Sequence, residues 1–438
     1  MSKRRPQLLF LAYFFPPANS PGCARTWNIA KYLARAGWDI KILTPHPSVW
    51  RRPENVEQTV RDIRKEGIQQ ILTDHRWRSL LPDYLKVSNR GVFWFAGGLC
   101  RQIARNLEID AAVGWLMPAF EKCRDLSRKD ADLILASGSF FLSFRLAWEL
   151  ASRIGCAYVL DYRDPWTANP HSSRFPGTTT VRREAELLAK SAAVTIVSDS
   201  LASDLERRFS LGSKLTVLTN GFCPEELGQV KPCQFDHFSI VYTGEFYPPK
   251  RIISPVFAAL QAIKMSQAAC PQWRFHYYGG NEAHVQDAAR HFGLTKEIVL
   301  HGKVFRNEAL SAVRGADVAV VITSVEREST RLERGIITGK LFEAIGSGTP
   351  TLVISPPGSD VEAIAAKTGL AQCYSGTDIS GISSFLTKAM RGDTPQRNNP
   401  DAYSWTHLGE RLNLLLRSIA GKQCGAEGLL SHRKAVKA

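Results

Sequence analysis

Residues 133–162, LILASGSFFLSFRLAWELASRIGCAYVLDY, contain the pattern from which the fold class can be predicted. A short apolar run at 133–137 is followed by a segment with helical periodicity, and a second apolar run follows at 158–162. Two apolar runs joined in this way are typical of parallel strands connected by a crossover helix. The unit therefore predicts an α/β fold built on a parallel sheet.

The same alternation extends along most of the 438 residues. In the first half, the predicted strands are 8–13, 39–44, 133–137, 158–162, 194–198 and 215–219. The alternation then starts again, with predicted strands at 239–243, 275–278, 298–300, 318–323 and 351–354. Two such series predict two parallel-sheet α/β domains.

The segment 222–237 has two prolines and no clear period, so we expect a linker there and a domain boundary near residue 230. The predicted domains are 1–230 and 231–420. A last helix is expected over about 405–419, and the basic tail 421–438 is expected to be disordered.

Composition excludes several classes of protein. With 44% hydrophobic and 22% charged residues, the chain is neither a disordered nor a fibrous protein. Its nine cysteines include no Cys-x-x-Cys pair, which argues against a structural zinc site and favours a reducing compartment. No apolar stretch reaches the roughly 20 residues that a membrane-spanning helix needs, and no signal peptide is apparent. We therefore expect a cytoplasmic protein.

The net charge of +15 is concentrated near the N-terminus, where residues 1–109 hold 18 Lys and Arg against 8 Asp and Glu. A local basic surface suits anionic lipid, nucleic acid or a phosphorylated substrate. The segment 74–106 also interleaves aromatic and basic residues, namely Trp77, Phe93, Trp94 and Phe95 with Arg101 and Arg105. Such a segment is typical either of a membrane interface or of a helical insert whose aromatic side chains pack in the core.

Ligands of open α/β sheets bind beyond the carboxyl ends of the strands, so two tandem domains predict sites that face each other across a cleft. After the first predicted strand, a helix is expected to begin near Gly22. The absence of a side chain there would let a ligand approach the backbone N–H groups at the helix start. The alternative is a plain strand-to-helix turn. No G-x-G-x-x-G fingerprint of a nicotinamide dinucleotide site is present.

The strand at 158–162 runs into Arg163, Asp164 and Trp166. The guanidinium can grip a phosphate or carboxylate, and the carboxylate can accept a proton or hold a sugar hydroxyl. The alternative is an internal Arg–Asp ion pair that orders the loop, with the Trp packed beneath it.

In the second half, the strand at 239–243 ends at Gly244, and Lys250 and Arg251 follow near a helix start. Two cations there suit a diphosphate, although a solvated pair is the alternative. Lys340 and Glu343 share one face of a later predicted helix. On that face the Lys340 ammonium could contact a phosphate while the Glu343 carboxylate binds the hydroxyls of a ribose. The alternative for the Glu is a surface residue that complements the helix dipole.

Taken together, several segments over residues 7–420 resemble the GT-B glycosyltransferases, specifically the family 4-like group that acts on nucleotide sugars. The resemblance rests on the order and spacing of YFFPPANSPGCAR, DAAVGWLMPAF, VLDYRDPW, TIVSDSLASDLERRF, LTNGF, IVYTGEF, VLHGKVFRNEALSAVRGADVAVVI and GKLFEAIGSGTP. It implies two facing Rossmann-like domains, an acceptor bound mainly by the first, a nucleotide sugar bound by the second, and a C-terminal helix that crosses back to the first.

The resemblance also implies roles for individual residues. Those expected near the donor are Gly244, Lys250, Arg251, His301, Gly302, Val304, Lys340, Leu341 and Glu343, with 301–304 near the base. Those expected to face the transferred sugar and the acceptor are Gly22, Arg25, Arg163, Asp164 and Trp166. The predicted catalytic residues are Arg163, Asp164, Lys250 and Arg251. Gly335 stands where the family often has a second Glu, and Arg163-Asp164 stands where many members have His-Asp.

The sequence thus predicts a glycosyltransferase that moves a sugar, with retention, from a nucleotide sugar to a lipid-linked or growing surface-polysaccharide glycan. A polyprenyl-linked acceptor would place the protein peripherally on the anionic inner face of the membrane. No metal or other cofactor is expected, because the cations can neutralise the diphosphate. The alternatives are a nucleotide-sugar epimerase of the same architecture and a non-catalytic nucleic-acid-binding protein on this scaffold, although nucleic acid is not the expected partner.

Overall fold

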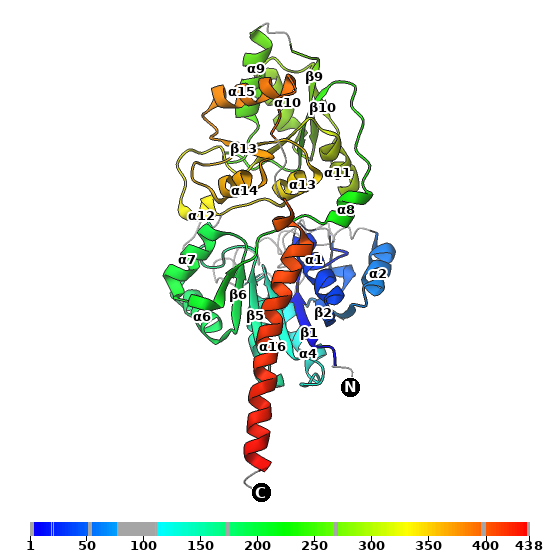
Figure 1. Ribbon diagram of the computed structural model, residues 1–438, viewed down its shortest axis with the longest axis vertical. Helices are drawn as coiled ribbons and strands as arrows, with labels where there is room; N and C mark the ends of the chain where they lie inside the picture. The colour runs from blue at the N-terminus through cyan, green and yellow to red at the C-terminus, as the bar shows by residue number, and fades with distance from the viewer. Residues whose placement is uncertain are drawn as a thin grey trace, which may run out of the picture. The chain divides into compact units, whose positions relative to one another are not determined.

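The computed structural model describes residues 4–18, 20, 22–50, 55–76, 110, 112–170, 176–266, 270–395 and 400–435 (Figure 1). The chain divides into two compact units. The first comprises Met1–Val197, Ala202–Leu218 and Leu408–Ala438, and the second comprises Ser198–Leu201 and Thr219–His407.

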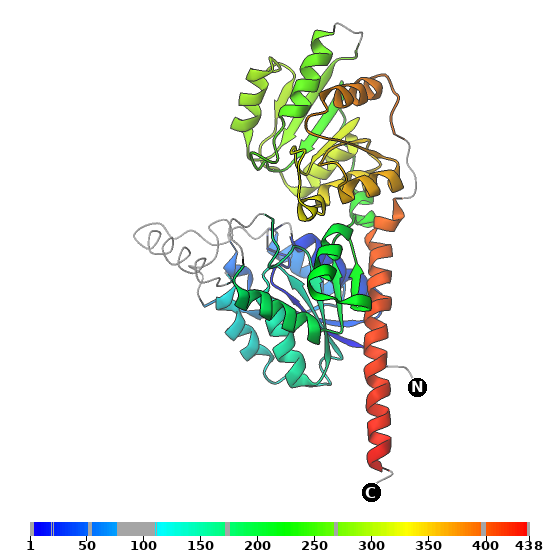
Figure 2. The same ribbon diagram turned by 90° about the vertical axis from the view of Figure 1, so that its left-hand side faces the viewer.

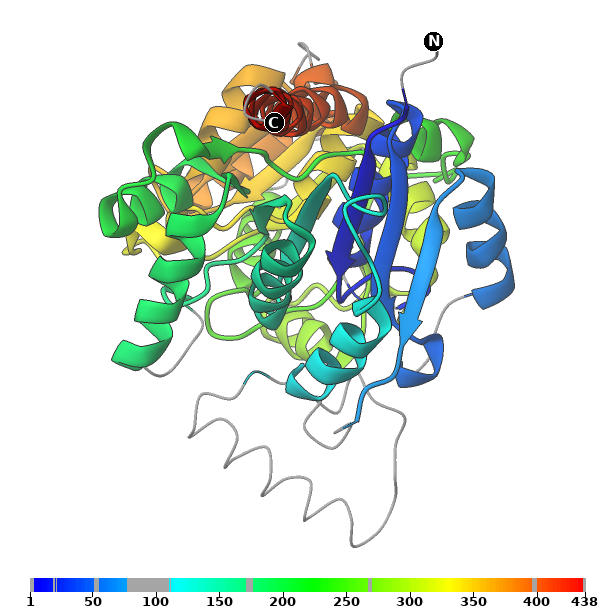
Figure 3. The same cartoon turned by 90° about the horizontal axis from the view of Figure 1, so that it is seen from below.

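The first unit is built on a seven-stranded parallel sheet. Its strands are β1 (Gln7–Ala12), β2 (Asp39–Pro45), β3 (Gln69–Thr73), β4 (Leu133–Gly138), β5 (Ala157–Tyr162), β6 (Ala193–Ile196) and β7 (Leu215–Val217). Their order in the sheet is β3-β2-β1-β4-β5-β6-β7, and Figure 3 shows β1, β2 and β3 side by side. All six predicted strands are present, and β3 is an additional edge strand.

Helices connect these strands as the crossover pattern requires. They are α1 (Gly22–Arg35), α2 (Val56–Lys65), α4 (Val113–Cys123), α5 (Leu142–Ile154), α6 (Thr178–Lys190) and α7 (Asp199–Phe209). The central helix α5 packs its apolar side on β4, β5 and β1. It ends at Gly155, whose φ of 79° lies in the left-handed region that terminates many helices.

The second unit has a six-stranded parallel sheet. Its strands are β8 (Phe238–Thr243), β9 (Trp273–Tyr278), β10 (Ile298–Leu300), β11 (Val318–Ile322), β12 (Thr351–Ile354) and β13 (Ala371–Tyr374). They lie in the order β10-β9-β8-β11-β12-β13. The five predicted strands are confirmed, and β13 is again an additional edge strand.

Helices cover both faces of this second sheet. They are α8 (Pro224–Gln229), α9 (Ser254–Met265), α10 (Glu282–His291), α11 (Arg306–Gly315), α12 (Arg331–Arg334), α13 (Gly339–Ser347), α14 (Asp360–Thr368) and α15 (Ile379–Met390). The α9–α15 pair shares an apolar core with Phe275 and Tyr277 of β9. Helices α11 and α13 contact each other and the central strands β8 and β11. The sheet is therefore buried on both sides, as in other doubly wound folds.

The boundary between the units differs from the predicted position near residue 230, because the second unit already includes Thr219 onward. Part of the predicted linker is packed in a core. Phe222 and Leu227 lie in one apolar cluster with Phe342 and Tyr403, so these residues fold with the second sheet. Chain polarity and proline content do not reveal such long-range packing.

The last helix, α16 (Trp405–Ala435), begins where the sequence predicts and extends past the expected end near residue 419, into the segment predicted to be disordered. From Leu408 onward it belongs to the first unit, which confirms the predicted return of the chain (Figure 2). The Trp38 Nε1–H donates to Asn413 Oδ1 at 2.8 Å, and Arg417 Nη2 donates to the Ala36 carbonyl at 2.7 Å. In the described parts of the chain, no helix combines the length and the apolar character needed to cross a bilayer.

Candidate functional site

Strand order identifies where each sheet can bind a ligand. In the first sheet the connections reverse direction between β1 and β4, and in the second they reverse between β8 and β11. A crevice opens at such a switch point, beyond the carboxyl ends of the strands. Most of the predicted site residues follow the carboxyl end of a strand or begin the next helix, so they lie at this edge of their sheets.

In the first unit, Gly22 and Arg163 lie in direct contact. A methyl group built on Gly22, the first residue of α1, would lie 1.4 Å from Arg163 Nη1. Only the missing side chain therefore allows the guanidinium to occupy this position. Arg163 Nε donates to Asp164 Oδ2 at 3.1 Å, and Nη2 donates to Ser139 Oγ at 3.2 Å. The guanidinium also lies 5.4 Å from the centre of the Phe14 ring.

Trp166, three residues after Arg163, stacks its ring on Phe141 at a centroid distance of 5.1 Å and an interplanar angle of 6°. The loop after β5 thus has both features of the structural alternative, an Arg–Asp ion pair and a packed Trp. Asp164 is nevertheless half exposed, and 18% of the Arg163 side chain is exposed. The guanidinium is held in a defined position and can still reach a ligand.

Arg25 has a different environment from the one that the sequence predicts. Its side chain is buried and forms a two-point ion pair with Asp161 of β5, with Nη2–Oδ1 at 2.6 Å and Nε–Oδ2 at 3.0 Å. Asp161 also accepts hydrogen bonds from Ser137 at 2.8 Å and Thr195 at 2.7 Å. Burial alone would raise the pKa of Asp161, but Arg25 and the hydroxyl donors hold it below its usual value. We therefore assign Arg25 to joining α1 to the sheet in place of the predicted acceptor contact.

In the second unit, Gly244 and Lys340 form a close pair that resembles the one in the first. Gly244 follows β8 with a φ of +107°, and a methyl group there would lie 1.9 Å from Lys340 Nζ. Lys340 is in the first turn of α13, whose N-cap Thr338 accepts a hydrogen bond from its backbone N–H. The ammonium also lies 5.4 Å from the centre of the Tyr242 ring. The tertiary fold thus brings together two residues that are far apart in the sequence.

The charge of Lys340 is poorly matched by its surroundings. Burial, together with the nearby Arg251, lowers the pKa of Lys340 to about 8, although Glu343 and Glu245 act in the opposite direction. Among the described residues, no carboxylate lies within ion-pair distance of its ammonium. Arg251 Nε is also buried without a hydrogen-bond partner. Two adjacent cations of this kind form an environment that favours an anion.

Lys250, which the sequence places beside Arg251, already has two carboxylate partners. Its ammonium pairs with Glu333 and lies 3.4 Å from Glu326 Oε2. The hydrogen bond to Glu333 is the main reason that the pKa of Lys250 is raised. Glu333 also closes a capping box with Thr330 at the start of α12. The charge of Lys250 is therefore neutralised within the protein, in contrast to that of Lys340.

Glu343 lies on α13 as predicted, but one of its oxygens is engaged. Its Oε1 lies 2.6 Å from Arg306 Nη1, and Arg306 also pairs with Glu226 at 2.7 Å. The neighbouring Glu343 is the main reason that the pKa of Arg306 is raised. Leu341 is fully buried, so it anchors the helix in the core and presents no side chain to a ligand.

The residues predicted near the base follow β10. The His301 ring stacks on Tyr278 with a centroid distance of 4.0 Å and an interplanar angle of 3°. Gly302 has a φ of +70°, and Val304 packs on the buried cluster around Val241. His301 also contacts His276, which the sequence analysis did not single out, because a lone His inside a strand has no recognisable spacing.

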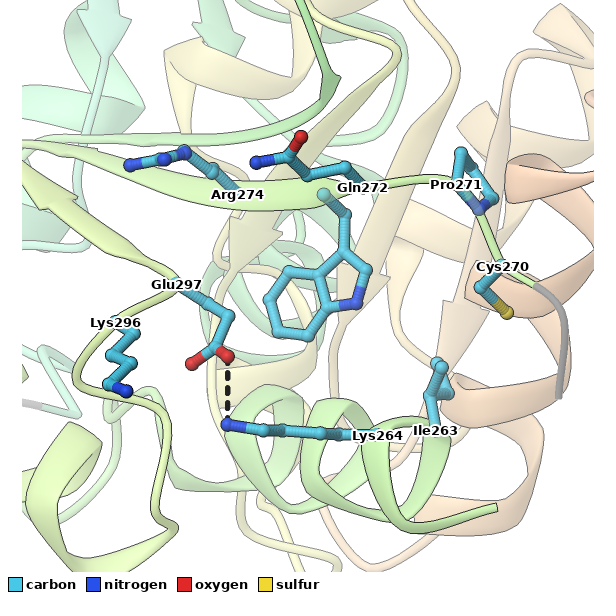
Figure 4. Close-up of a pocket in the computed structure, with 9 residues that line it drawn as sticks. Ile263, Lys264, Cys270, Pro271, Gln272, Arg274, Lys296 and Glu297 are labelled. Carbon is cyan, nitrogen blue, oxygen red and sulfur yellow. Dashed lines mark ion pairs between the residues drawn. The ribbon is translucent and has the colours of Figure 1, made fainter. Parts of the chain in front are cut away.

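Two other features lie at the opposite, amino-terminal edges of the sheets. A cavity of about 410 Å³ lies beside the start of β9, and Lys264 and Glu297, which line it, form an ion pair at 2.7 Å. Figure 4 shows the residues that line this cavity. Asp130 and Asp132 form an Asp-x-Asp pair just before β4, but they bond to Lys41 and Arg4. Within the described ranges, no three His, Cys, Asp or Glu side chains gather where they could hold a metal ion.

Comparisons with known proteins agree with the two-domain fold. Residues 23–221 match the family model described as a glycosyl transferase 4-like domain. A search of curated proteins finds no significant match. Sucrose-phosphate synthase from Thermosynechococcus elongatus has a similar structure, with a TM-score of 0.59 and 14% identity over 99% of this chain and 100% of that chain.

Two further solved structures are similar over nearly the same length. HepE from Anabaena, in complex with UDP and glucose, has a TM-score of 0.56 and 11% identity over 94% of this chain and 99% of that chain. The lipopolysaccharide outer core galactosyltransferase WaaB has a TM-score of 0.54 and 10% identity over the same shares, 94% and 99%. Identities this low show a common fold and do not transfer a substrate.

Proposed function

Because the chain has the two-domain GT-B fold and its residues 23–221 match a glycosyl transferase 4-like domain, we propose that it transfers a sugar from a nucleotide sugar to an acceptor. The observation that carries the proposal is the pair of cations at the carboxyl end of β8. Lys340 lies over the Gly244 backbone beside Arg251, with no described carboxylate paired to its ammonium. A diphosphate supplies the missing negative charge. The bound UDP of HepE, a protein of similar fold, lends support.

The same cations would stabilise the transition state. As the bond between sugar and diphosphate breaks, the leaving diphosphate gains negative charge and the sugar becomes oxocarbenium-like. Lys340 is largely shielded from water. A fixed charge acts more strongly in such a buried site than on the protein surface. Glu343 would hold the ribose hydroxyls with the carboxylate oxygen that Arg306 does not engage. We propose retention of configuration on the basis of the family resemblance.

On the acceptor side, we propose that Arg163 and Asp164 bind the acceptor next to Trp166. Arg163 provides a partly exposed cation at the edge of the first sheet, which suits an anionic group on the acceptor. A lipid-linked or growing surface glycan fits this requirement when it carries a phosphate. The similar structure of WaaB, a lipopolysaccharide core galactosyltransferase, supports an acceptor of this class.

We further propose that a polyprenyl-linked acceptor is reached at an anionic membrane surface, because residues 1–109 hold 18 basic against 8 acidic residues. Trp77, Phe93, Trp94 and Phe95 lie outside the described residues. Sedimentation with anionic vesicles should show binding at low salt that declines as salt rises, since screening acts within about 8 Å at physiological ionic strength. Absence of binding at low salt would contradict the membrane proposal.

Calorimetric titration of UDP and GDP tests the donor site. We expect Lys340→Ala to weaken nucleoside diphosphate binding by about 10- to 100-fold, because a charge-assisted contact is lost. Lys264→Ala is the matched control, since Lys264 belongs to the same unit but lies at the other edge of its sheet. Equal binding by the wild type and Lys340→Ala would contradict the site.

Incubation with a panel of nucleotide sugars then separates the possible reactions. A glycosyltransferase releases the nucleoside diphosphate when an acceptor or water takes the sugar. An epimerase that only inverts a sugar carbon leaves the nucleotide sugar intact. A nucleic-acid-binding protein that has lost this chemistry would neither bind the free diphosphate nor release it from a nucleotide sugar.

A further inference from the structure

Three histidine rings lie in a row on one side of the second sheet. His237 precedes β8, His276 is within β9, and His301 follows β10. His237 Nε2 lies 2.8 Å from His276 Nε2, and His276 Nδ1 lies 3.0 Å from His301 Nε2. At the His237 end of the row, His237 Nδ1 contacts the carboxylate of Asp236. The row thus leads from a carboxylate to the strand end where the base of a nucleotide is expected.

The pKa values of His276 and His301 are both lowered, which favours the neutral form of these two rings. Burial, and then the neighbouring His301, His237 and Arg274, lower the pKa of His276 to about 4. Burial also lowers the pKa of His301, which Glu308 only partly offsets. A neutral imidazole has one N–H and one bare nitrogen, so each contact between two rings needs one of each. The direction of one hydrogen bond therefore fixes the direction of the next.

When His237 is neutral, its Nδ1–H donates to Asp236 and its Nε2 is bare. His276 must then donate through Nε2–H, which leaves its Nδ1 to accept from the Nε2–H of His301. Under this condition, His301 Nδ1 is a bare acceptor.

When His237 gains a proton, every bond in the row reverses. His237 Nε2–H donates to His276 Nε2, and His276 Nδ1–H donates to His301 Nε2. His301 then carries its own proton on Nδ1. One proton has been added in total, because His276 and His301 each exchange an Nε2–H for an Nδ1–H. His301 Nδ1 has thereby changed from an acceptor to a donor.

We propose that His237, His276 and His301 form a proton relay that sets the hydrogen-bond polarity of His301 Nδ1 and so determines which base of the donor is bound. The inference rests on the proposed function, because it needs a nucleotide base beside His301. A protonated relay presents an N–H, which favours a keto oxygen such as O4 of uracil. A neutral relay presents a bare nitrogen, which favours an amino group such as N4 of cytosine.

The surroundings allow protons to reach the outer ring. His237 and Asp236 line a cavity of about 630 Å³ together with Arg314 and Asp317. The Asp236 side chain is 95% exposed, whereas only 10% of His237 is exposed. The charged neighbours of the row are therefore Asp236, Arg274, Arg314 and Asp317 around the first two rings and Glu308 beside the third.

A shared metal ion does not account for these contacts. Two nitrogens that bind one zinc ion at about 2.0–2.1 Å lie about 3.3 Å apart or more. The nitrogen pairs here are 2.8 and 3.0 Å apart, which is the range of a direct hydrogen bond. The row is therefore a chain of hydrogen bonds.

Nitrogen NMR of histidine-labelled protein tests the relay without any nucleotide. As the pH falls from about 8 to about 5.5, His276 and His301 should change together from Nε2–H to Nδ1–H tautomers. The change should disappear in His237→Phe, which keeps an aromatic ring at the accessible end of the row. His291→Gln, an exposed position on α10, should behave as the wild type does. Tautomers that do not change with pH in the wild type would overturn the proposal.

Binding of UDP and CDP then tests the consequence for the base. UDP and CDP carry the same diphosphate, and both would contact Lys340. Titration of the phosphates and of Lys340 therefore affects both affinities equally and cancels in their ratio. In the wild type, we expect the preference for UDP over CDP to increase about three- to tenfold between about pH 7.5 and 5.5, which is the value of one hydrogen bond. In His237→Phe the ratio should stay constant.

The possible failures can be told apart. A pH-independent ratio in the wild type, with both nucleotides bound, would overturn the role in base selection. If neither nucleotide binds at any pH, the proposed function fails, and the NMR tautomers still decide whether the relay exists. His276→Phe provides a second interruption of the row and should abolish the tautomer change of His301, provided that the thermal unfolding of the variant remains cooperative.

Discussion

Gly22 controls the position of Arg163 through the absence of a side chain. Because an added methyl group would lie 1.4 Å from Arg163 Nη1, the guanidinium must move in Gly22→Ala. The moving atoms are the flexible end of a long side chain, so the free energy of unfolding should change by less than about 1 kcal/mol. We expect kcat/KM to fall about tenfold or more, because a positioned charge is displaced.

Gly228→Ala is the control for this experiment, since a methyl group at Gly228 on α8 would have no neighbour within 4 Å. Steady-state kinetics and chemical denaturation measure the two quantities. An unchanged kcat/KM in Gly22→Ala would show that Arg163 takes no part in the reaction.

Lys340 gives donor binding a specific pH dependence. The pKa of Lys340 is lowered from its usual value to about 8, so the ammonium is charged below that pH and becomes neutral above it. The affinity for UDP should therefore decrease as the pH rises from about 7 to about 9. Lys340→Arg should not show this decrease, because a guanidinium stays charged throughout the range. Parallel pH profiles for the two proteins, measured by titration calorimetry, would contradict a role for Lys340.

At the level of elements, the Arg25–Asp161 ion pair connects α1 to the middle of the first sheet. Asp161→Asn leaves a buried guanidinium without its counter-charge, which typically costs about 3–5 kcal/mol of unfolding free energy. Since the pKa of Asp161 is lowered in the folded protein, its contribution is present above its unfolded pKa of about 3.9 and is lost as the pH falls through the lower folded value. Urea unfolding at neutral pH measures the loss.

Asp164→Asn is the control for Asp161→Asn, because Asp164 follows the same strand but is half exposed. Its unfolding free energy should change by less than about 1 kcal/mol. If the two variants are equally stable, the buried pair does not hold α1 to the sheet and the predicted acceptor role of Arg25 should be reconsidered.

On the scale of the whole molecule, α16 makes the stability of the first unit depend on the last part of the chain. Leu416 is fully buried, whereas Leu414 on the same helix is 68% exposed. Leu416→Ala should destabilise the first unit by about 2–5 kcal/mol, because it leaves a cavity. Leu414→Ala should have almost no effect. Scanning calorimetry should show a lower transition for the first unit and an unchanged transition for the second.

A downward shift of both transitions in Leu416→Ala would show that the two units unfold together. Equal effects of the two leucine substitutions would contradict the assignment of α16 to the core of the first unit.

The alternation of apolar runs and helical periods was enough to predict the architecture of this protein. Eleven strands were predicted, and nine of them are central strands, which are buried on both faces and therefore continuously apolar. The other two, β7 with Leu-Thr-Val and β10 with Ile-Val-Leu, are edge strands that are still mostly apolar. The two strands that were not predicted, β3 with Gln-Gln-Ile-Leu-Thr and β13 with Ala-Gln-Cys-Tyr, are edge strands with polar residues in them. An edge strand is less buried, so selection for apolar residues is weaker and the pattern fades. The start of α16 and its return to the first unit also followed from sequence and family resemblance.

The pairing of charged side chains, in contrast, could be read only from the folded protein. From the sequence, Lys250 and Arg251 were both expected to bind the donor because they are adjacent. Arg25 and Arg163 were both expected to face the acceptor because of their positions after strands of the first sheet. In the folded protein, Lys250 forms an ion pair with Glu333 and Arg25 forms one with Asp161. Lys340 has no described carboxylate partner. The partners are 83 and 136 residues apart, and Coulomb energy depends on distance in space and on burial, neither of which a linear pattern contains. For the same reason, the histidine row became visible only when β9 and β10 were placed side by side.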